Sequence, residues 1–181
     1  MLALVLALTV STASIDDWNV ERLATNRNGM FVLGGWAVAN LVGGAIGFGV
    51  ATDETWRYFH LGNLVWNGVN VALAVVGLIS NWKPDDQPLD LKDAMKGSQN
   101  LEKVFFLNVG LDVAYLATAA FLWQRGDATN DRRFVGFGQA LLLQGGFLFA
   151  FDLVMAFLNL RLSNKLFERL NLTPLGLSGT F

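Results

Sequence analysis

Polar side chains recur at helical spacing inside stretches of this sequence that are otherwise apolar. When each stretch is drawn as a helix with 100° per residue, its polar residues fall on one face and leave the other face apolar. The polar faces carry Trp36 and Asn40; His60, Asn63, Asn67 and Asn70; Asn108, Asp112 and Tyr115; and Gln144, Asp152 and Asn159. A central aspartate costs a membrane helix roughly 2.5–3.5 kcal/mol on insertion scales. Asp112 and Asp152 are therefore the most informative of these residues.

Two carboxylates that lie close together in a dry site cannot both ionise easily, so they share a proton or hold a cation. Such a pair suits a proton or ion pathway, or a pocket for a small polar ligand. The structural alternative is that Asn, Gln and Asp join helices, at roughly 0.6 kcal/mol or somewhat more per contact. We favour that interpretation for the asparagines. For Asp112 and Asp152 both interpretations stay open, because a neutral residue would join helices at lower cost.

The polar residues also fall at similar depths when depth is counted from the face that carries the long central linker. A rise of about 1.5 Å per residue puts both aspartates about 12 Å deep, and the next three residues about 15–16 Å deep. The first predicted layer contains Asp112, Asp152, Asn40, Asn70 and Tyr115. The second predicted layer, nearer the other face, contains His60, Asn63 and Gln144.

Several kinds of chemistry lack the residues they need. The chain has no cysteine, which excludes disulfides, iron–sulfur clusters and thiol catalysis. The single histidine, His60, excludes an all-histidine metal site and a bis-histidine haem within one chain, so no metal site and no particular cofactor is predicted. His60 could relay protons or bind haem, but a hydrogen bond at headgroup level is the preferred interpretation. The chain has no Walker loop, HExxH or GxSxG, so we predict no catalytic residues.

Four apolar runs must position these groups. They cover about residues 30–51, 58–80, 104–123 and 134–160. Each reaches the roughly 20 residues that cross about 30 Å of hydrocarbon, where a backbone must form helix to satisfy its own hydrogen bonds. Hydrophobic residues make up 53% of the chain and charged residues 15%, against about 25% charged in soluble domains. We predict an all-α integral membrane four-helix bundle over residues 15–172, rather than a soluble bundle.

The connections predict two antiparallel transmembrane hairpins. The segments 52–57 and 124–133 are short, whereas the linker 81–103 is long and charged. We expect a short interfacial helix in that linker and another one that starts near Ser14. The tail, residues 173–181, is predicted to be loop. Gly43 and Gly47 form a GxxxG pattern, which predicts helix packing.

The orientation in the membrane stays open. The face with the linker and both ends of the chain has nine basic residues and the other face has four, which favours the first face inside. Residues 1–14 argue against this, because an apolar run followed by small residues resembles a cleavable signal peptide, although a basic start is missing.

Three groups of motifs together are similar to a known family. They are Asn28-Gly29-Met30 with Leu33-Gly34-Gly35-Trp36-Ala37; Tyr58-Phe59-His60 with Trp66-Asn67 and Val69-Asn70; and Gly110-Leu111-Asp112-Val113-Ala114-Tyr115 with Gln144-Gly145-Gly146-Phe147 and Asp152. Over roughly residues 20–160 the chain resembles small multi-pass membrane proteins of Bacteroidetes-type bacteria that are known only as a domain of unknown function. The resemblance implies a bacterial inner-membrane protein, and it implies no activity, cofactor or catalytic residue.

Three functions compete at this point. The first is a membrane protein whose polar layer binds or conducts a proton, an ion or a small polar solute. The second is a structural or accessory subunit of a larger membrane complex, and the third is a membrane enzyme that acts on lipid or quinone. The bilayer is the expected partner, with a homo-oligomer or a larger complex left open. The net charge of −2 argues against nucleic acid.

Overall fold

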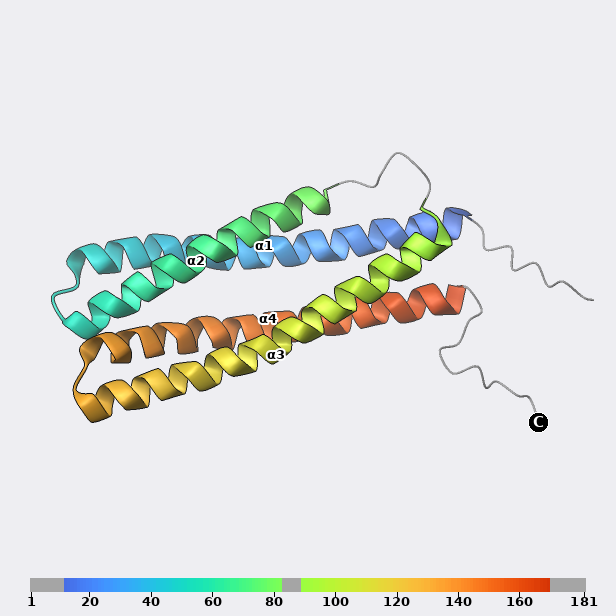
Figure 1. Ribbon diagram of the computed structural model, residues 1–181. Coiled ribbons are helices and arrows are strands. Elements are labelled where there is room, and N and C mark those ends of the chain that lie inside the picture. Colours follow the sequence, from blue (N-terminus) through green and yellow to red (C-terminus); the bar gives the residue numbers. More distant parts are fainter. Residues whose placement is uncertain (1–11, 83–88, 170–181) are drawn as a thin grey trace, which may run out of the picture.

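The computed structural model describes residues 12–82 and 89–169. Its secondary structure consists of the helices α1 (Thr12–Val50), α2 (Glu54–Ser80), α3 (Leu91–Thr129) and α4 (Arg132–Arg169). They form two antiparallel hairpins, α1–α2 and α3–α4, that lie side by side (Figure 1). All four helices are long and apolar enough to cross a membrane, which confirms the predicted all-α four-helix fold. The predicted signal peptide lies mostly, and the tail 173–181 entirely, outside the described residues.

Three of the helices are much longer than the apolar runs within them. α1 and α3 each have 39 residues and α4 has 38. At 1.5 Å per residue each is nearly 60 Å long, about twice the thickness of a hydrocarbon core. The expectation of separate interfacial helices was therefore wrong. The segment near Ser14 belongs to α1, and the helical part of the linker belongs to α3.

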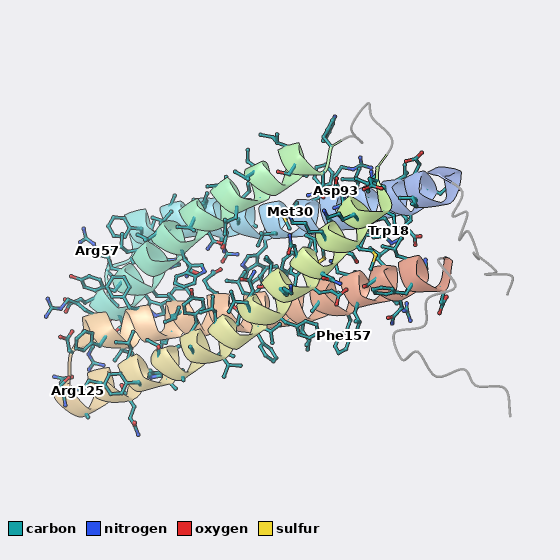
Figure 2. All side chains as sticks on the ribbon, turned by 45° about the vertical axis from the view of Figure 1, so that its right-hand side comes forward. Trp18, Met30, Arg57, Asp93, Arg125 and Phe157 are labelled. Atoms are coloured by element: carbon teal, nitrogen blue, oxygen red, sulfur yellow. The ribbon has the colours of Figure 1, made fainter. Side chains whose placement is uncertain are left out.

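These extra turns pack against each other, which explains why they continue the long helices. Ile15, Trp18, Ala94 and Leu166 form a buried apolar cluster between α1, α3 and α4. An interfacial helix would turn such residues toward lipid headgroups, whereas here they cover one another. We call this part of the bundle the charged end. It comprises residues 12–27, 91–103 and 161–169, and Figure 2 places Trp18 and Asp93 there and Arg57 and Arg125 at the opposite end.

Hydrogen bonds fix the register of α1 and α4 at the charged end. The Trp18 indole Nε1 donates to the Leu162 carbonyl at 2.8 Å. The side-chain amides of Asn26 and Asn159 donate to each other, at 3.1 and 3.2 Å. Lys165 forms an ion pair with Glu21 on the surface. The buried groups of Trp18, Asn26 and Asn159 are thus paired between the two helices.

Short turns close both hairpins, as predicted. Asp53 caps α2, because its carboxylate accepts from the Trp56 backbone N–H at 3.2 Å. Asn130 ends α3 in the left-handed conformation with φ 53°. Next to it, Asp131 pairs with Arg133, and this guanidinium lowers the pKa of the Asp131 carboxyl.

Glycines of α4 let this helix approach α2 of the other hairpin and α3 of its own hairpin. A Cβ at Gly136 would lie 2.8 Å from the backbone nitrogen of Phe59 on α2, and one at Gly138 would lie 2.6 Å from the backbone nitrogen of Trp123 on α3. Only glycine permits such an approach of two backbones. The prediction for Gly43 was wrong, because a Cβ there would meet nothing. Gly47 does lie in a packed position, against the His60 ring.

The outward faces of the helices are apolar. Val, Leu, Ile and Phe side chains are more than half exposed along all four helices, for example Val42, Val65, Leu107 and Phe157. α4 lies at the centre of the arrangement and packs against the other three helices. Within the described residues, the backbones of α2 and α3 stay apart, and no Cα atom of one lies within 8 Å of a Cα atom of the other. This gap positions the candidate site.

Candidate functional site

The two aspartates that the sequence singled out meet in the interior of the bundle. Asp112 on α3 is 2% exposed and Asp152 on α4 is 6% exposed. Their carboxyl groups lie within interaction distance of each other. The prediction that both occupy the same depth therefore agrees with the structure. They come together because α3 and α4 form a hairpin, so that residues at similar distances from the turn become neighbours.

The pair is short of hydrogen-bond donors. The Asn108 side-chain amide approaches Asp152 Oδ1 at 3.5 Å, at the limit of a hydrogen bond. Asp112 Oδ2 is buried and has no hydrogen-bond partner among the residues that the structure describes. An ionised carboxylate only accepts, so two facing carboxylates cannot satisfy each other unless one of them carries a proton. The pair therefore needs a shared proton, a cation or a donor group from a ligand.

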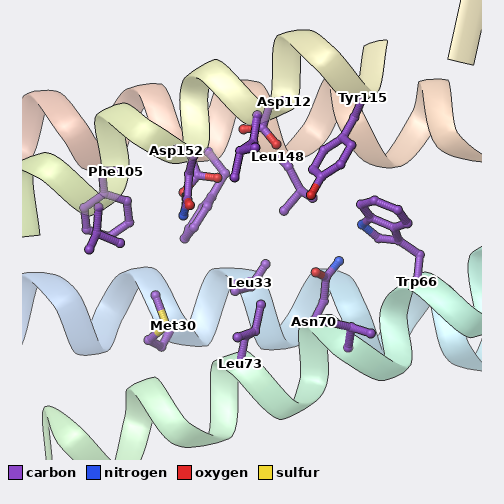
Figure 3. A pocket seen from close by; sticks show the side chains of 15 residues that line it. Met30, Leu33, Trp66, Asn70, Leu73, Phe105, Asp112, Tyr115, Leu148 and Asp152 are labelled. Atoms are coloured by element: carbon purple, nitrogen blue, oxygen red, sulfur yellow. Dashed lines mark hydrogen bonds between the residues drawn. The ribbon is translucent and has the colours of Figure 1, made fainter. Parts of the chain in front are cut away.

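A cavity of about 370 Å³ adjoins the pair. Such a volume is within the range of small-molecule sites, roughly 300–1,000 Å³. In Figure 3, Asp112, Tyr115 and Asp152 line one side of the cavity, and Leu33 and Asn70 line the opposite side. The walls are mainly apolar and aromatic. They consist of Met30, Leu33, Trp66, Val69, Asn70, Leu73, Val104, Phe105, Asn108, Leu111, Asp112, Tyr115, Leu148, Phe151 and Asp152.

The cavity lies where α2 and α3 separate. Trp66 on α2 and Tyr115 on α3 cross the gap with an edge-to-face contact, with ring centroids 5.0 Å apart and planes at 84°. This pair bounds one end of the cavity, and the Tyr115 hydroxyl points inward (Figure 3). Three of the five residues in the predicted first layer, Asp112, Tyr115 and Asp152, thus lie together here. Asn70 also belongs to the lining, from the α2 side.

Asn40 is not part of this layer. Its Oδ1 accepts from Gln144 Nε2 at 3.2 Å, so Asn40 belongs with the predicted second layer. The depth estimate took the ends of two apolar runs, residues 30 and 160, as level. The hydrogen bonds between Asn26 and Asn159 show that α1 reaches this level about one turn earlier, so Asn40 lies about one turn deeper than estimated.

Gln144 is the centre of the second layer. It is fully buried on α4, and its Oε1 accepts from the Trp36 indole Nε1 at 2.9 Å. Its Nε2 donates to both Asn40 and Asn63, the latter at 2.5 Å. One glutamine therefore connects α4 to α1 and α2 and uses both of its amide hydrogens. Asn63 and Gln144, which were predicted to lie in one layer, are thus in direct contact.

His60 lies beside this network rather than in it. It lines a second hollow with Asn40 and Asn63, and its ring packs against Gly47. It also stacks with Trp56, with centroids 6.1 Å apart. His60 therefore lies near the other residues of the predicted second layer. Among the described hydrogen bonds, none joins it to Gln144.

Several asparagines also form a hydrogen bond within their own helix, besides the expected contacts between helices. The side-chain amides of Asn40, Asn63 and Asn67 donate to the carbonyl four residues earlier in their own helix, at 2.8 to 3.0 Å. Each amide thereby satisfies its donor locally and leaves Oδ1 for a second partner. Of these three, Asn40 and Asn63 also use that oxygen to accept from another helix.

Sequence reasoning missed two contributors. Asn108 shares a helical face with Asp112, yet it was not among the predicted site residues, and it supplies the amide that approaches Asp152. Trp36 was not among the predicted site residues either, and its indole N–H donates to Gln144. The spacing of Trp36 and Asn40, one helical turn apart, was the available signal.

The comparisons with known proteins identify a family but no activity. A family model described as "Family of unknown function (DUF6992)" matches residues 32–153, about two thirds of the chain. This region contains both polar layers and every residue of the cavity lining except Met30. No curated protein and no solved structure gives a match.

Proposed function

The chain belongs to the family of unknown function DUF6992, and we propose that it is a multi-pass membrane protein whose Asp112–Asp152 pair binds an exchangeable proton or a cation. The observation that carries this proposal is the buried Asp112 Oδ2 without a hydrogen-bond partner, beside a second carboxyl and at the wall of a cavity. The membrane is the bacterial inner membrane, as the family resemblance implies.

The hydrogen bonds of Gln144 with Trp36, Asn40 and Asn63 differ from the surroundings of the aspartates, and this difference supports a binding role for the aspartates. Between α4 and the α1–α2 hairpin, the buried polar contacts around Gln144 are made by neutral amides, and both amide hydrogens of Gln144 are paired. Asp112 and Asp152 form no such contact between the two hairpins, although both are buried. A buried charged group that is left unpaired costs far more than a neutral amide. Binding of a proton or a cation removes that cost.

We expect Asp112→Asn and Asp152→Asn each to abolish proton or cation exchange while the bundle remains folded. Asparagine keeps the size of the side chain and removes the group that can take up charge. In liposomes loaded with a pH-sensitive dye, a potassium diffusion potential should drive a proton flux through the wild-type protein. In both variants the flux should fall to that of empty liposomes.

Infrared spectroscopy tests the same pair without requiring transport. The wild type should show a protonated-carboxyl band that titrates, and each asparagine variant should lack it. Asp93→Asn, at an exposed position of α3, is the matched control and should behave as wild type. If the titrating band is unchanged in both buried variants, the pair does not bind the proton and the proposal is wrong.

Orientation can be tested cleanly because the chain has no cysteine. Gln99→Cys reports on the charged end and Ala128→Cys on the α3–α4 turn, and both positions are exposed. The excess of basic residues predicts the charged end inside. A membrane-impermeant maleimide applied to intact bacterial cells should therefore label Ala128→Cys and spare Gln99→Cys. The reverse pattern would show that the signal-like start determines the orientation.

A further inference from the structure

The cavity beside the aspartates opens toward the outer surface of the bundle. Four of its lining residues, Val69 and Leu73 on α2 and Val104 and Leu111 on α3, are 43–58% exposed. They face one another across the gap between two helices whose backbones stay apart in the described part of the chain. If this surface is covered by lipid, as the proposed function requires, the mouth of the cavity meets the bilayer and not water.

The interior of the cavity favours positive charge. Two carboxyl groups lie in its wall, and none of the described residues that line it is lysine or arginine. Trp66, Tyr115, Phe105 and Phe151 supply aromatic rings to the same wall. Aromatic faces attract ammonium groups, and more strongly when the site is dry. An anion would meet only repulsion and apolar surface in this place.

The rest of the wall favours an apolar body. Besides the aromatic rings, it consists of the side chains of Met30, Leu33, Val69, Leu73 and other aliphatic residues. A metal ion that leaves water for a protein site needs several oxygen ligands in place of its hydration shell. Among the described residues no group of three or more His, Cys, Asp or Glu side chains comes together. The chemistry of this wall therefore matches an organic cation better than an inorganic one.

We propose that the site binds a lipophilic organic cation, a long-chain amine or quaternary ammonium ion, which enters from the bilayer between α2 and α3. This inference rests on the proposed function, because it names the ligand of the same carboxyl pair. The cationic head lies at Asp112 and Asp152, and the alkyl chain extends through the mouth between Val69 and Leu111. On binding, the proton shared by the pair leaves for the solvent, so that charge is exchanged for charge.

Octyltrimethylammonium is the probe, and octanesulfonate, with the same chain and the opposite charge, is its control. We expect calorimetry on the protein in nanodiscs to detect saturable binding of the cation and none of the anion. Titrations in two buffers of different ionisation enthalpy should reveal the release of about one proton. In the pH range in which the pair holds a proton, the affinity for the cation should rise about tenfold for each unit by which the pH increases.

Two kinds of variant test separately the charge of the site and the access through its mouth. Asp112→Asn should weaken binding of the cation by about tenfold or more, as expected for loss of a desolvated charge contact. Val69→Trp places a large side chain in the mouth and should also weaken binding by about tenfold. Val65→Trp, one helical turn away on the same exposed face of α2 but outside the lining, should change the affinity by less than about twofold.

The outcomes distinguish this inference from the function on which it rests. If the cation and the anion bind equally, or if Val65→Trp and Val69→Trp have the same effect, the lipophilic-cation site between α2 and α3 is wrong. The proposed function still stands in that case, provided the titrating carboxyl band disappears in the asparagine variants. If the band is unchanged in those variants, the proposed function fails first.

Discussion

Gly136→Ala is expected to prevent stable association of the two hairpins. The new Cβ would lie 2.8 Å from the Phe59 backbone nitrogen and closer still to the Thr55 carbonyl oxygen. Both atoms belong to the backbone of α2, so no side chain can rotate away, and α2 and α4 must move apart. Overpacking of this kind costs about 1–3 kcal/mol or more. We place the effect at the upper end of that range, because rigid helices transmit the displacement along their length.

Gly146→Ala is the matched control for this prediction. Gly146 lies in the same helix, and a Cβ there would meet nothing within 4 Å. Alanine also has a higher helix propensity than glycine, so this variant should be as stable as wild type or slightly more stable. Thermal unfolding in mild detergent, followed by size-exclusion chromatography, measures both variants. Equal unfolding midpoints for the two would mean that α4 does not approach α2 as closely as the structure has it.

Gln144→Leu is expected to destabilise the bundle by about 2 kcal/mol or more. Leucine has a similar volume, but it removes the hydrogen bonds to Trp36, Asn40 and Asn63. Three interhelical contacts at about 0.6 kcal/mol each account for most of this value. The indole N–H of Trp36 is then left without its acceptor inside the bundle, which adds a further cost.

The control for Gln144→Leu is Gln124→Leu, at an exposed position near the end of α3. That variant should unfold within about 0.5 kcal/mol of wild type. A double-mutant cycle between Gln144→Ala and Asn63→Ala measures the central contact directly, since coupled residues depart from additivity. Additive effects in this cycle would contradict the role of Gln144 as the connection between the hairpins.

The two polar layers therefore differ in what they lack. Every amide hydrogen of Gln144 has an acceptor, so the contacts of Gln144 are complete without a ligand. The Asp112–Asp152 layer has an acceptor without a donor and a cavity beside it. The structural interpretation that the sequence left open thus fits the amides around Gln144. The binding interpretation fits the aspartates.

Local sequence pattern was sufficient for the helices and for much of the site. Long apolar runs with short turns predicted two antiparallel hairpins, and helical spacing put Asp112 and Tyr115 on one face. The hairpin then brought Asp152 next to Asp112, as equal depth required. These predictions succeeded because they depend on the length of an apolar run and on the period of the helix, which are properties of the chain alone.

Other features were decided only when the helices packed. Asn40 joined Gln144 instead of the aspartates, Gly136 rather than Gly43 made the close approach, and α2 separated from α3 to leave the cavity. The rotation of each helix about its axis and its shift along that axis determine all three. Lipid is as apolar as a leucine side chain, so hydrophobicity does not select them. They follow from van der Waals fit and hydrogen bonds between helices, which exist only in the assembled bundle.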